Sequence, residues 1–211
     1  MADDRPQNPH HAALLLIDVL NDFEGVVDLA EQARPAAQAI KALCAEARVS
    51  GVPIVYVNDN FALWHSDRAQ IVEHCRRPDS NGRAIVDLLA PEEDDYFVIK
   101  PRYSGFYATN LPVLLPQLGA TRLIVTGFAT DICVLFTATD AYMREYNLWI
   151  PADCVAANTS ERSSTALAHM AKILKAEIAA TGALQLTDWL NRKSPIRNAR
   201  GSRWVRDGRD A

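Results

Sequence analysis

Short apolar runs alternate with helical patterns along almost the whole chain, and this alternation constrains the fold more than any other feature. Continuous apolar runs are typical of strands buried on both faces, whereas longer stretches with apolar residues at helical spacing predict helices. The predicted strands are residues 12–20, 52–57, 96–100, 122–126, 148–150 and 183–186, and the predicted helices are 29–48, 83–90, 109–118, 131–146 and 160–180. Such β–α units predict a parallel sheet covered by helices on both sides.

The length of 211 residues decides between two architectures that use such units. A TIM barrel needs about eight units and about 250 residues, so it does not fit. We therefore expect an α/β fold with a doubly wound, six-stranded parallel sheet. Neither an internal repeat nor a linker precedes residue 190, so residues 1–190 are predicted to form one domain. Residues 191–211 are predicted to be a basic C-terminal arm that is not a domain.

The net charge of −4 is unevenly distributed. From Arg192 onward seven basic residues stand against two acidic ones, a local charge of +5, which leaves −9 on the rest of the chain. The acidic body gives no reason to expect a nucleic-acid partner. Because the arm interleaves Ile196 and Trp204 with arginines, a binding module that contacts nucleic acid or another anionic surface is an alternative. We favour an arm that reaches an acidic surface of a neighbouring subunit.

Neither a targeting segment nor a membrane partner is predicted. The first residues, MADDRPQNPHH, are polar and lack the apolar centre of a signal peptide. The apolar run 12–17 is too short to cross a bilayer. The four cysteines lack the CxxC spacing of structural zinc sites, so reduced thiols in a cytoplasmic protein are expected: Cys44, Cys75, Cys133 and Cys154.

Three reactive side chains lie where predicted parallel strands end. Asp18 ends the first strand, Lys100 ends the third, and Cys133 lies just inside the helix after the fourth. Ligands of open α/β sheets bind outside the carboxyl ends of the strands, so these three can meet at one edge. Their combination supplies an acid or base, a cation and a nucleophile, which favours a catalytic site.

Cysteine is commonly a small buried residue, and Cys44 is expected in the core. Cys133 differs because it follows the turn 127–131 near a predicted helix N-terminus. The partial positive charge there favours a thiolate and could bind an oxyanion. Cys75 follows His74 directly, but adjacent residues on a helix point about 100° apart, so a Cys–His dyad is not predicted.

The segment 57–75 carries residue types that bind metals, namely His65 and His74 with Asp59 and Asp67. Neither HxH nor HExxH occurs there, so we expect a polar active-site loop and assign no metal. The phosphate-binding patterns GxGxxG and GxxxxGK[ST] do not occur in the sequence, so no cofactor is expected.

Five segments together resemble the isochorismatase-like cysteine hydrolases, which include nicotinamidases, N-carbamoylsarcosine amidohydrolases and ureidoacrylate hydrolases. The segments are LLLIDVLNDF (14–23), VPIVYVND (52–59), VIKPRYSGF (98–106), RLIVTGFATDICV (122–134) and TATDAYMREY (137–146). They follow the order of the family over residues 12–187. The most specific elements are the aspartate after the first strand, Lys-Pro-x-x-Ser-x-Phe and Gly-x-x-Thr-x-x-Cys-Val.

The resemblance implies the strand order 3-2-1-4-5-6, a homo-oligomer (dimer or tetramer) and a catalytic triad of Asp18, Lys100 and Cys133. It also implies a non-proline cis peptide, here at Ala129–Thr130, which would aim the N–H of Ala129 or Thr130, with that of Cys133, into an oxyanion hole. Metal-binding nicotinamidases have an Asp-x-His element and a further His after the second strand. The segment 57–75 departs from that pattern, so a nicotinamidase assignment is not favoured.

The expected reaction is hydrolysis of a small amide, N-carbamoyl or ureido C–N bond through a thioester acyl-enzyme. Vinyl-ether hydrolysis of the isochorismatase type is the alternative reaction, and it does not depend on a cysteine nucleophile. The partner is a small-molecule substrate that is partly apolar or planar. Side chains near the same edge are expected to contact it: Phe23, Asn58, Trp64, Tyr103, Phe106 and Phe128.

Overall fold

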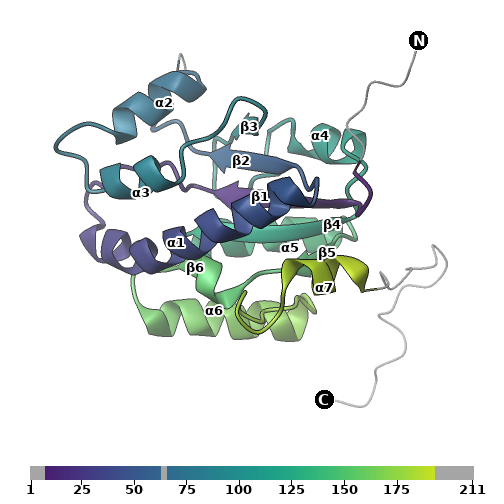
Figure 1. Ribbon diagram of the computed structural model, residues 1–211. Helices are drawn as coiled ribbons and strands as arrows, with labels where there is room; N and C mark the ends of the chain where they lie inside the picture. Colours follow the sequence, from purple (N-terminus) through teal and green to yellow (C-terminus); the bar gives the residue numbers. More distant parts are fainter. Residues whose placement is uncertain (1–7, 63–65, 193–211) are drawn as a thin grey trace, which may run out of the picture.

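The computed structural model describes residues 8–62 and 66–192, in which helices cover both faces of a parallel β-sheet (Figure 1). The strands are β1 (Ala12–Ile17), β2 (Ile54–Asn58), β3 (Tyr96–Ile99), β4 (Arg122–Phe128), β5 (Asn147–Trp149) and β6 (Val155–Ala156). The helices are α1 (Val27–Val49), α2 (Arg68–Cys75), α3 (Arg83–Leu88), α4 (Leu111–Gln117), α5 (Leu135–Met143), α6 (Ser160–Ile173) and α7 (Leu186–Asn191), with a π-helical turn η1 (Thr130–Val134) and a 3-10 turn η2 (Ala152–Cys154). The predicted α/β class is confirmed.

The sheet order is β3-β2-β1-β4-β5, and all of these neighbours are parallel. The central strand β1 places Leu14 opposite Ile54 of β2 and Ile124 of β4. Every residue of β1 is buried, because helices cover both faces, and its sequence is therefore apolar without alternation. The strand order reverses between β1 and β4, as in other doubly wound sheets.

The prediction of a strand at residues 183–186 is wrong. The N–H groups of Ala183 and Leu184 both bond to the carbonyl oxygen of Ala180, so this segment closes a turn and leads into α7. The sixth strand is instead β6, which pairs with the end of β4. Trp149, the last residue of β5, forms an isolated parallel bridge with Glu177.

Helix α2 lies in a segment that the sequence predicted as a polar loop. Asp67 begins it with a capping box: its side chain accepts the N–H of Gln70, and the Gln70 side chain accepts the N–H of Asp67. The buried residues of α2 are Ile71 and Cys75, which is too few to produce a clear helical periodicity.

Two predicted helices are shorter than expected. The segment 131–146 divides into η1 and α5, because the turn that carries Cys133 is π-helical. The helix predicted at 160–180 ends at Ile173, and Lys175 then adopts a φ of +55°, which turns the chain away from the helix axis.

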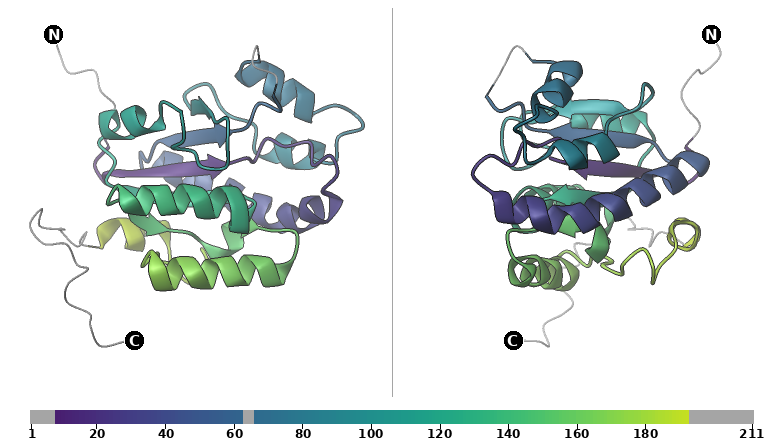
Figure 2. Two further views of the ribbon diagram at one scale, coloured as in Figure 1. Left: turned by 180° about the vertical axis from the view of Figure 1, so that it is seen from behind. Right: turned by 60° about the vertical axis from the view of Figure 1, so that its left-hand side comes forward.

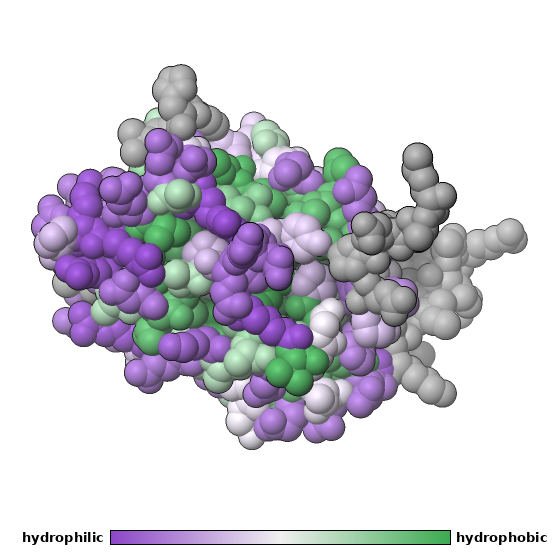
Figure 3. Space-filling view, turned by 45° about the horizontal axis from the view of Figure 1, so that its top comes forward, coloured by the Kyte–Doolittle hydropathy of each residue, from purple (hydrophilic) through white to green (hydrophobic). Residues whose placement is uncertain are grey.

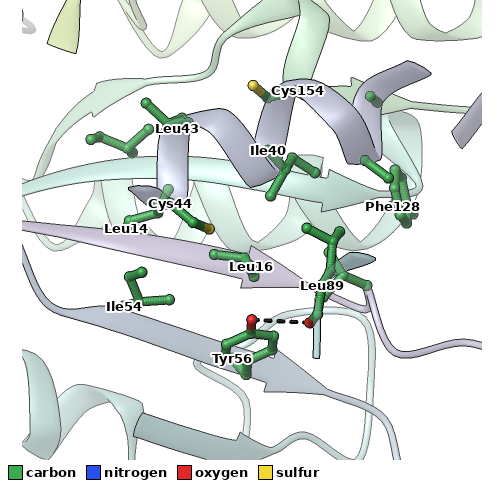
Figure 4. Packing of buried hydrophobic residues seen from close by; sticks show 14 of the residues in the cluster. Leu14, Leu16, Ile40, Leu43, Cys44, Ile54, Tyr56, Leu89, Phe128 and Cys154 are labelled. Carbon is green, nitrogen blue, oxygen red and sulfur yellow. Dashed lines mark hydrogen bonds between the residues drawn. The ribbon is translucent and has the colours of Figure 1, made fainter. Parts of the chain in front are cut away.

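Two hydrophobic cores lie on opposite faces of the sheet (Figure 2). The first includes α1, α2, α3 and α7, and the second includes α4, α5 and α6. In the first core, Leu14 and Leu16 pack with Ile40, Leu43 and Cys44 of α1 (Figure 4). Full burial of one such aliphatic side chain contributes about 1.5–3 kcal/mol. The prediction that Cys44 lies in the core is confirmed.

Arg122, the first residue of β4, connects the sheet to the C-terminal helix. Its guanidinium lies over the Trp189 ring, with Cζ 4.1 Å from the ring centroid. Nη1 donates to the carbonyl oxygen of Leu190 at 2.8 Å, and Nη2 donates to that of Trp189. A weaker contact of 3.3 Å joins Nη1 to the carbonyl oxygen of Arg192. A buried cation therefore satisfies the free carbonyl groups at the end of α7.

The face of the molecule in Figure 3 mixes hydrophilic and hydrophobic side chains. Exposed large apolar side chains include Tyr103 and Phe136, whose ring centroids are 5.6 Å apart. Among the helices of residues 8–62 and 66–192, none is long and apolar enough to cross a membrane.

Candidate active site

Asp18, Lys100 and Cys133 come together at the carboxyl edge of the sheet. The Nζ of Lys100 lies 2.7 Å from Oδ2 of Asp18 and 3.5 Å from Sγ of Cys133. The side chains of Asp18 and Cys133 are close enough to shift each other's pKa. Asp18 and Lys100 directly follow β1 and β3, and Cys133 lies in η1 after β4, so the parallel order of the strands gathers all three.

Hydrogen bonds to β2 and the residue after it hold Asp18 in place. Its N–H donates to the carbonyl oxygen of Val57 at 3.0 Å, and its Oδ1 accepts the N–H of Asp59 at 2.9 Å. The backbone of Asp18 is left-handed, with φ +49°, a conformation that aspartate tolerates better than most residues. This turn directs the carboxylate toward Lys100.

Lys100 is 1% exposed, and its ammonium has an acceptor for each of its three protons. Two are Asp18 and Cys133, and the third is the carbonyl oxygen of Arg102 at 3.1 Å. Its backbone N–H donates to the carbonyl oxygen of Asn58, which continues the pairing of β2 with β3. Because every donor is used, the ammonium is held in one position between the acid and the thiol.

Burial dominates the acid–base properties of the cluster. It raises the pKa of Asp18, and the charge of Lys100 only partly opposes this. Burial alone would lower the pKa of Lys100, but the charge of Asp18 and its hydrogen bond to Lys100 outweigh burial and raise that pKa. Burial, followed by the charge of Asp18, raises the pKa of Cys133 despite the opposing charge of Lys100.

The raised pKa of Cys133 opposes the thiolate that its position near a helix N-terminus favours. The reason is that a desolvated site beside a carboxylate disfavours a second negative charge more than the start of a helix favours it. The raised pKa of Asp18 makes this carboxylate a stronger proton acceptor than an ordinary aspartate.

Gly127 permits β4 to approach β1 closely just before the turn that carries Cys133. A Cβ on this residue would lie 2.0 Å from the carbonyl oxygen of Ile17, and its φ of +109° is open to glycine alone. From α6, Ser163 Oγ contacts Thr130 Oγ1 at 2.9 Å, and Arg162 pairs with Asp131 at 2.5 Å. The turn that carries Cys133 is thus fixed by both the sheet and α6.

The cis peptide lies at Phe128–Ala129, one bond before the expected Ala129–Thr130 position. β4 continues through Phe128, which pairs with Ala156, and η1 begins at Thr130. The change of direction therefore falls at Ala129, the single residue between the two elements. The Ala129 carbonyl oxygen accepts the N–H groups of Ile132 and Val134.

Four of the expected substrate contacts are buried in packing instead. Phe23 and Phe128 belong to the first core, with ring centroids 6.0 Å apart, and Phe106 belongs to the second. Asn58 is completely buried: its Oδ1 accepts the N–H of Leu20 at 3.0 Å and its Nδ2 donates to the Leu20 carbonyl oxygen at 2.6 Å. Asn58 thereby supports the loop after β1.

Of the remaining expected contacts, Tyr103 is exposed beside Phe136. Trp64 and His65 lie outside the described residues. A cavity of about 450 Å³ adjoins the triad through Asp59, which bonds to Asp18, and through Pro101 and Arg102, which follow Lys100. Its lining residues are Asp59, Asn60, Phe61, Ala62, Pro101 and Arg102. Sequence reasoning did not identify Arg102 as a residue of this cavity, although it lies within the motif that contains Lys100.

A second cavity of about 450 Å³ shares Asn60 and Phe61 with the first and extends to α2. His74 lines it between two partners: Nε2 lies 2.9 Å from Oδ2 of Asp22, and Nδ1 lies 3.1 Å from Nη1 of Arg77. These contacts connect Asp22 to His74 of α2. Cys75, the next residue, is buried in the core.

Among the described residues, three or more His, Cys, Asp or Glu side chains do not come together in a group that could bind a metal ion.

A family model for the isochorismatase domain matches residues 12–182. The chain belongs to the isochorismatase family. It is a hydrolase with a small-molecule substrate, as the other members described below indicate.

Two relatives of this isochorismatase-family hydrolase differ in how similar they are to it. The uncharacterised isochorismatase family protein YaaI of Bacillus subtilis is 44% identical over 168 residues, which cover 79% of this chain and 92% of YaaI. The ureidoacrylate amidohydrolase RutB of Methylorubrum extorquens is 34% identical over 161 residues, which cover 63% of this chain and 64% of RutB. The chain thus spans less than two thirds of the length of RutB.

Solved structures of other members share the fold. N-carbamoylsarcosine amidase from Thermoplasma acidophilum is 26% identical with a TM-score of 0.64, over 82% of this chain and 98% of that one. A nicotinamidase from Staphylococcus aureus is 25% identical with a TM-score of 0.61, over 80% and 97% of the two chains.

Proposed function

We propose that this isochorismatase-family hydrolase cleaves a small amide, N-carbamoyl or ureido C–N bond through an acyl-enzyme on Cys133. One observation carries the proposal: a buried lysine lies within hydrogen-bond distance of both a carboxylate and a thiol. A nucleophile beside a base that is itself oriented by a third group is the general arrangement for covalent catalysis.

In the first step Asp18 accepts the proton of the Cys133 thiol while Sγ forms a bond to the carbonyl carbon of the substrate. Coupling these events avoids a free thiolate, which the raised pKa of Cys133 disfavours. The carbonyl electron pair moves to oxygen, and backbone N–H groups of Cys133 and of Ala129 or Thr130 stabilise that oxyanion. Lys100 remains charged throughout and stabilises the partial negative charge that develops on sulfur during proton transfer.

In the second step the oxyanion collapses, the C–N bond breaks, and Asp18 returns its proton to the leaving nitrogen. An amide yields a thioester, and a ureido group yields the corresponding thiocarbamate. Water then attacks the same carbonyl carbon while Asp18 accepts its proton. Breakdown of this intermediate releases the acid and restores the thiol, with the proton passing from Asp18 to Sγ.

The activities for which related proteins are named support a C–N bond as the target. RutB is named a ureidoacrylate amidohydrolase, and the compared structures are a nicotinamidase and an N-carbamoylsarcosine amidase. All three names describe attack at a carbonyl carbon bonded to nitrogen. A cysteine at the centre of the cluster favours this chemistry over vinyl-ether hydrolysis, which needs no such nucleophile.

The test is a screen of small primary amides, N-carbamoyl compounds and ureido compounds for ammonia release. Cys133→Ala and Cys133→Ser should abolish turnover, with circular dichroism and urea unfolding used to establish that both variants fold. Mass spectrometry of the wild-type protein trapped with a slow substrate should place the added acyl mass on the peptide containing Cys133. Full activity in Cys133→Ala would contradict the mechanism, and activity confined to vinyl ethers would contradict the substrate class.

A further inference from the structure

We propose that two side chains of α5, Thr137 and Asp140, are positioning residues for the Lys100 ammonium. They hold the loop 101–106, which contains the serine of the Lys-Pro-x-x-Ser-x-Phe motif and contacts Lys100 through a backbone carbonyl group. The inference rests on the proposed function for the role of Lys100. It adds which residues outside the triad set the distance between this cation and the nucleophile Cys133.

Two hydrogen bonds join the loop to α5. The Oγ of Ser104 donates to Oδ2 of Asp140 at 2.5 Å, and the N–H of Gly105 donates to Oγ1 of Thr137 at 2.9 Å. The Ser104 hydroxyl also accepts the N–H of Phe106 at 3.1 Å, so it fixes the turn of the loop as well. Thr137 and Asp140 are three residues apart on a helix and therefore share one face. Because Ser104 is 7% exposed and Thr137 is completely buried, a lost bond would leave a polar group away from solvent.

Packing presses the same loop between β2 and α5. A Cβ on Gly105 would lie 2.8 Å from Cγ1 of Val57, so only a glycine allows the loop to come this close to the sheet. Phe106 is buried in the second core. Arg144 bonds to Oδ1 of Asp140 at 2.7 Å, and its Cζ lies 4.8 Å from the centroid of the Phe106 ring. The loop is thus held at consecutive residues.

The loop acts on the reacting atoms through one carbonyl group. The carbonyl oxygen of Arg102, just before the anchored Ser104, accepts a hydrogen bond from Nζ of Lys100 at 3.1 Å. The same Nζ lies 3.5 Å from Sγ of Cys133. Cys133 lies in η1, which continues directly into α5. One helix therefore holds both the nucleophile and the loop that anchors its cation.

The expected size of the effect follows from the 3.5 Å separation of Nζ and Sγ. The charge of Lys100 lowers the pKa of Cys133, although burial and the charge of Asp18 raise it overall. If the ammonium moves away by about 1 Å, the thiolate population falls about sixfold at an effective dielectric constant of about 20. A thiolate of higher pKa is a stronger nucleophile, so the rate of alkylation falls less, by about threefold.

The test is alkylation of Cys133 by iodoacetamide at about pH 8, followed by mass spectrometry of the peptide that contains it. Thr137→Val, which keeps the side-chain shape but removes the acceptor, should lower the rate constant about threefold. Thr137→Ser keeps the hydroxyl and should recover most of that loss. Asp140→Ala should lower the rate as Thr137→Val does, and Asp140→Asn, which still accepts the Ser104 hydroxyl, should lower it less.

The matched control is Thr139→Val, the same substitution on α5 at a hydroxyl that donates to the Leu135 carbonyl oxygen within the helix. It should keep the wild-type rate. Rates within about 1.5-fold of wild type in both Thr137→Val and Asp140→Ala would overturn the inference. Circular dichroism and urea unfolding establish that each variant folds.

A double variant separates positioning from a general loosening of the site. If Thr137 acts through Lys100, adding Thr137→Val to Lys100→Met should leave the alkylation rate of Lys100→Met unchanged. A further change as large as that seen in the wild-type background would overturn the inference. With a substrate from the ammonia-release screen, Thr137→Val should lower kcat about threefold while KM stays within about twofold of wild type.

The alkylation assay needs no substrate, so it distinguishes this inference from the proposed function. Alkylation that follows the expected pattern, together with full amide hydrolysis by Cys133→Ala, would refute the proposed function and leave the positioning role standing. Alkylation unaffected by Thr137→Val and Asp140→Ala, together with an inactive Cys133→Ala, would refute the positioning role alone.

Discussion

Replacing Lys100 by Met should show how strongly the buried cluster depends on one positive charge. Lys100 Nζ donates to Asp18, Cys133 and the Arg102 carbonyl oxygen, and the side chain is 1% exposed. Methionine has a similar length but leaves the Asp18 carboxylate buried without its cation. Removing one partner of a buried ion pair costs about 3–5 kcal/mol. For a domain of this size, that loss corresponds to a decrease in Tm of about 6–20 °C.

The destabilisation should depend on pH in a defined direction. Burial already raises the pKa of Asp18, and the loss of Lys100 raises it further. A group whose pKa is higher in the folded than in the unfolded state contributes stability at low pH, and this contribution is lost as pH rises through the folded-state pKa. The difference in stability between Lys100→Met and wild type should therefore be small near pH 4, about the ordinary aspartate pKa, and grow toward neutral pH.

Urea unfolding over this pH range measures the effect, with Lys172→Met on the exposed side of α6 as the control. The double variant Asp18→Asn/Lys100→Met should recover part of the lost stability at neutral pH, because it no longer buries an unpaired charge. The reasoning is refuted if Lys100→Met loses equal stability at every pH, or if the double variant is no more stable than Lys100→Met.

Two further predictions concern the support of the site and the C-terminal arm. Asn58→Ala leaves the N–H and carbonyl groups of Leu20 without their side-chain partners. It should therefore lower the free energy of unfolding by about 2–4 kcal/mol, which urea unfolding measures. An unchanged urea midpoint would contradict this supporting role of Asn58. Removal of residues 193–211 keeps the 2.7 Å contact of Arg192 with Glu177, and it should lower the mass of the oligomer in light scattering if the arm joins subunits. An unchanged mass would reject that role for the arm.

The gathering of Asp18, Lys100 and Cys133 could be predicted from the sequence because it depends on the strand order and little else. Strands that are apolar throughout can be recognised in the sequence, and all strands of a parallel sheet have their carboxyl ends on one edge. Residues that directly follow these strands could therefore be placed together at that edge from the sequence alone. The protonation state of Cys133 did not follow in this way, because it depends on how deeply the surrounding loops bury the thiol.

The direction in which a side chain leaves a loop could not be predicted from sequence spacing. Phe23 and Asn58 both lie near the carboxyl edge of the sheet, yet both turn inward, Phe23 into the first core and Asn58 toward the backbone of Leu20. Arg102, by contrast, lines the cavity although its neighbour Lys100 is buried. The short pairing of β6 with β4 was missed for a similar reason: two residues carry too little pattern to identify a strand.

The two ends of β4 contact different parts of the protein, and Arg122 lies at the end that contacts α7. The strand begins at the residue that secures α7 and ends, seven residues long, next to the turn that carries Cys133. Arg192 consequently lies at the end of the sheet opposite the cluster of Asp18, Lys100 and Cys133 (Figure 1). A carrier, affinity handle or surface linker that replaces residues 193–211 and is joined directly to Arg192 would therefore start at the end of the sheet opposite that cluster.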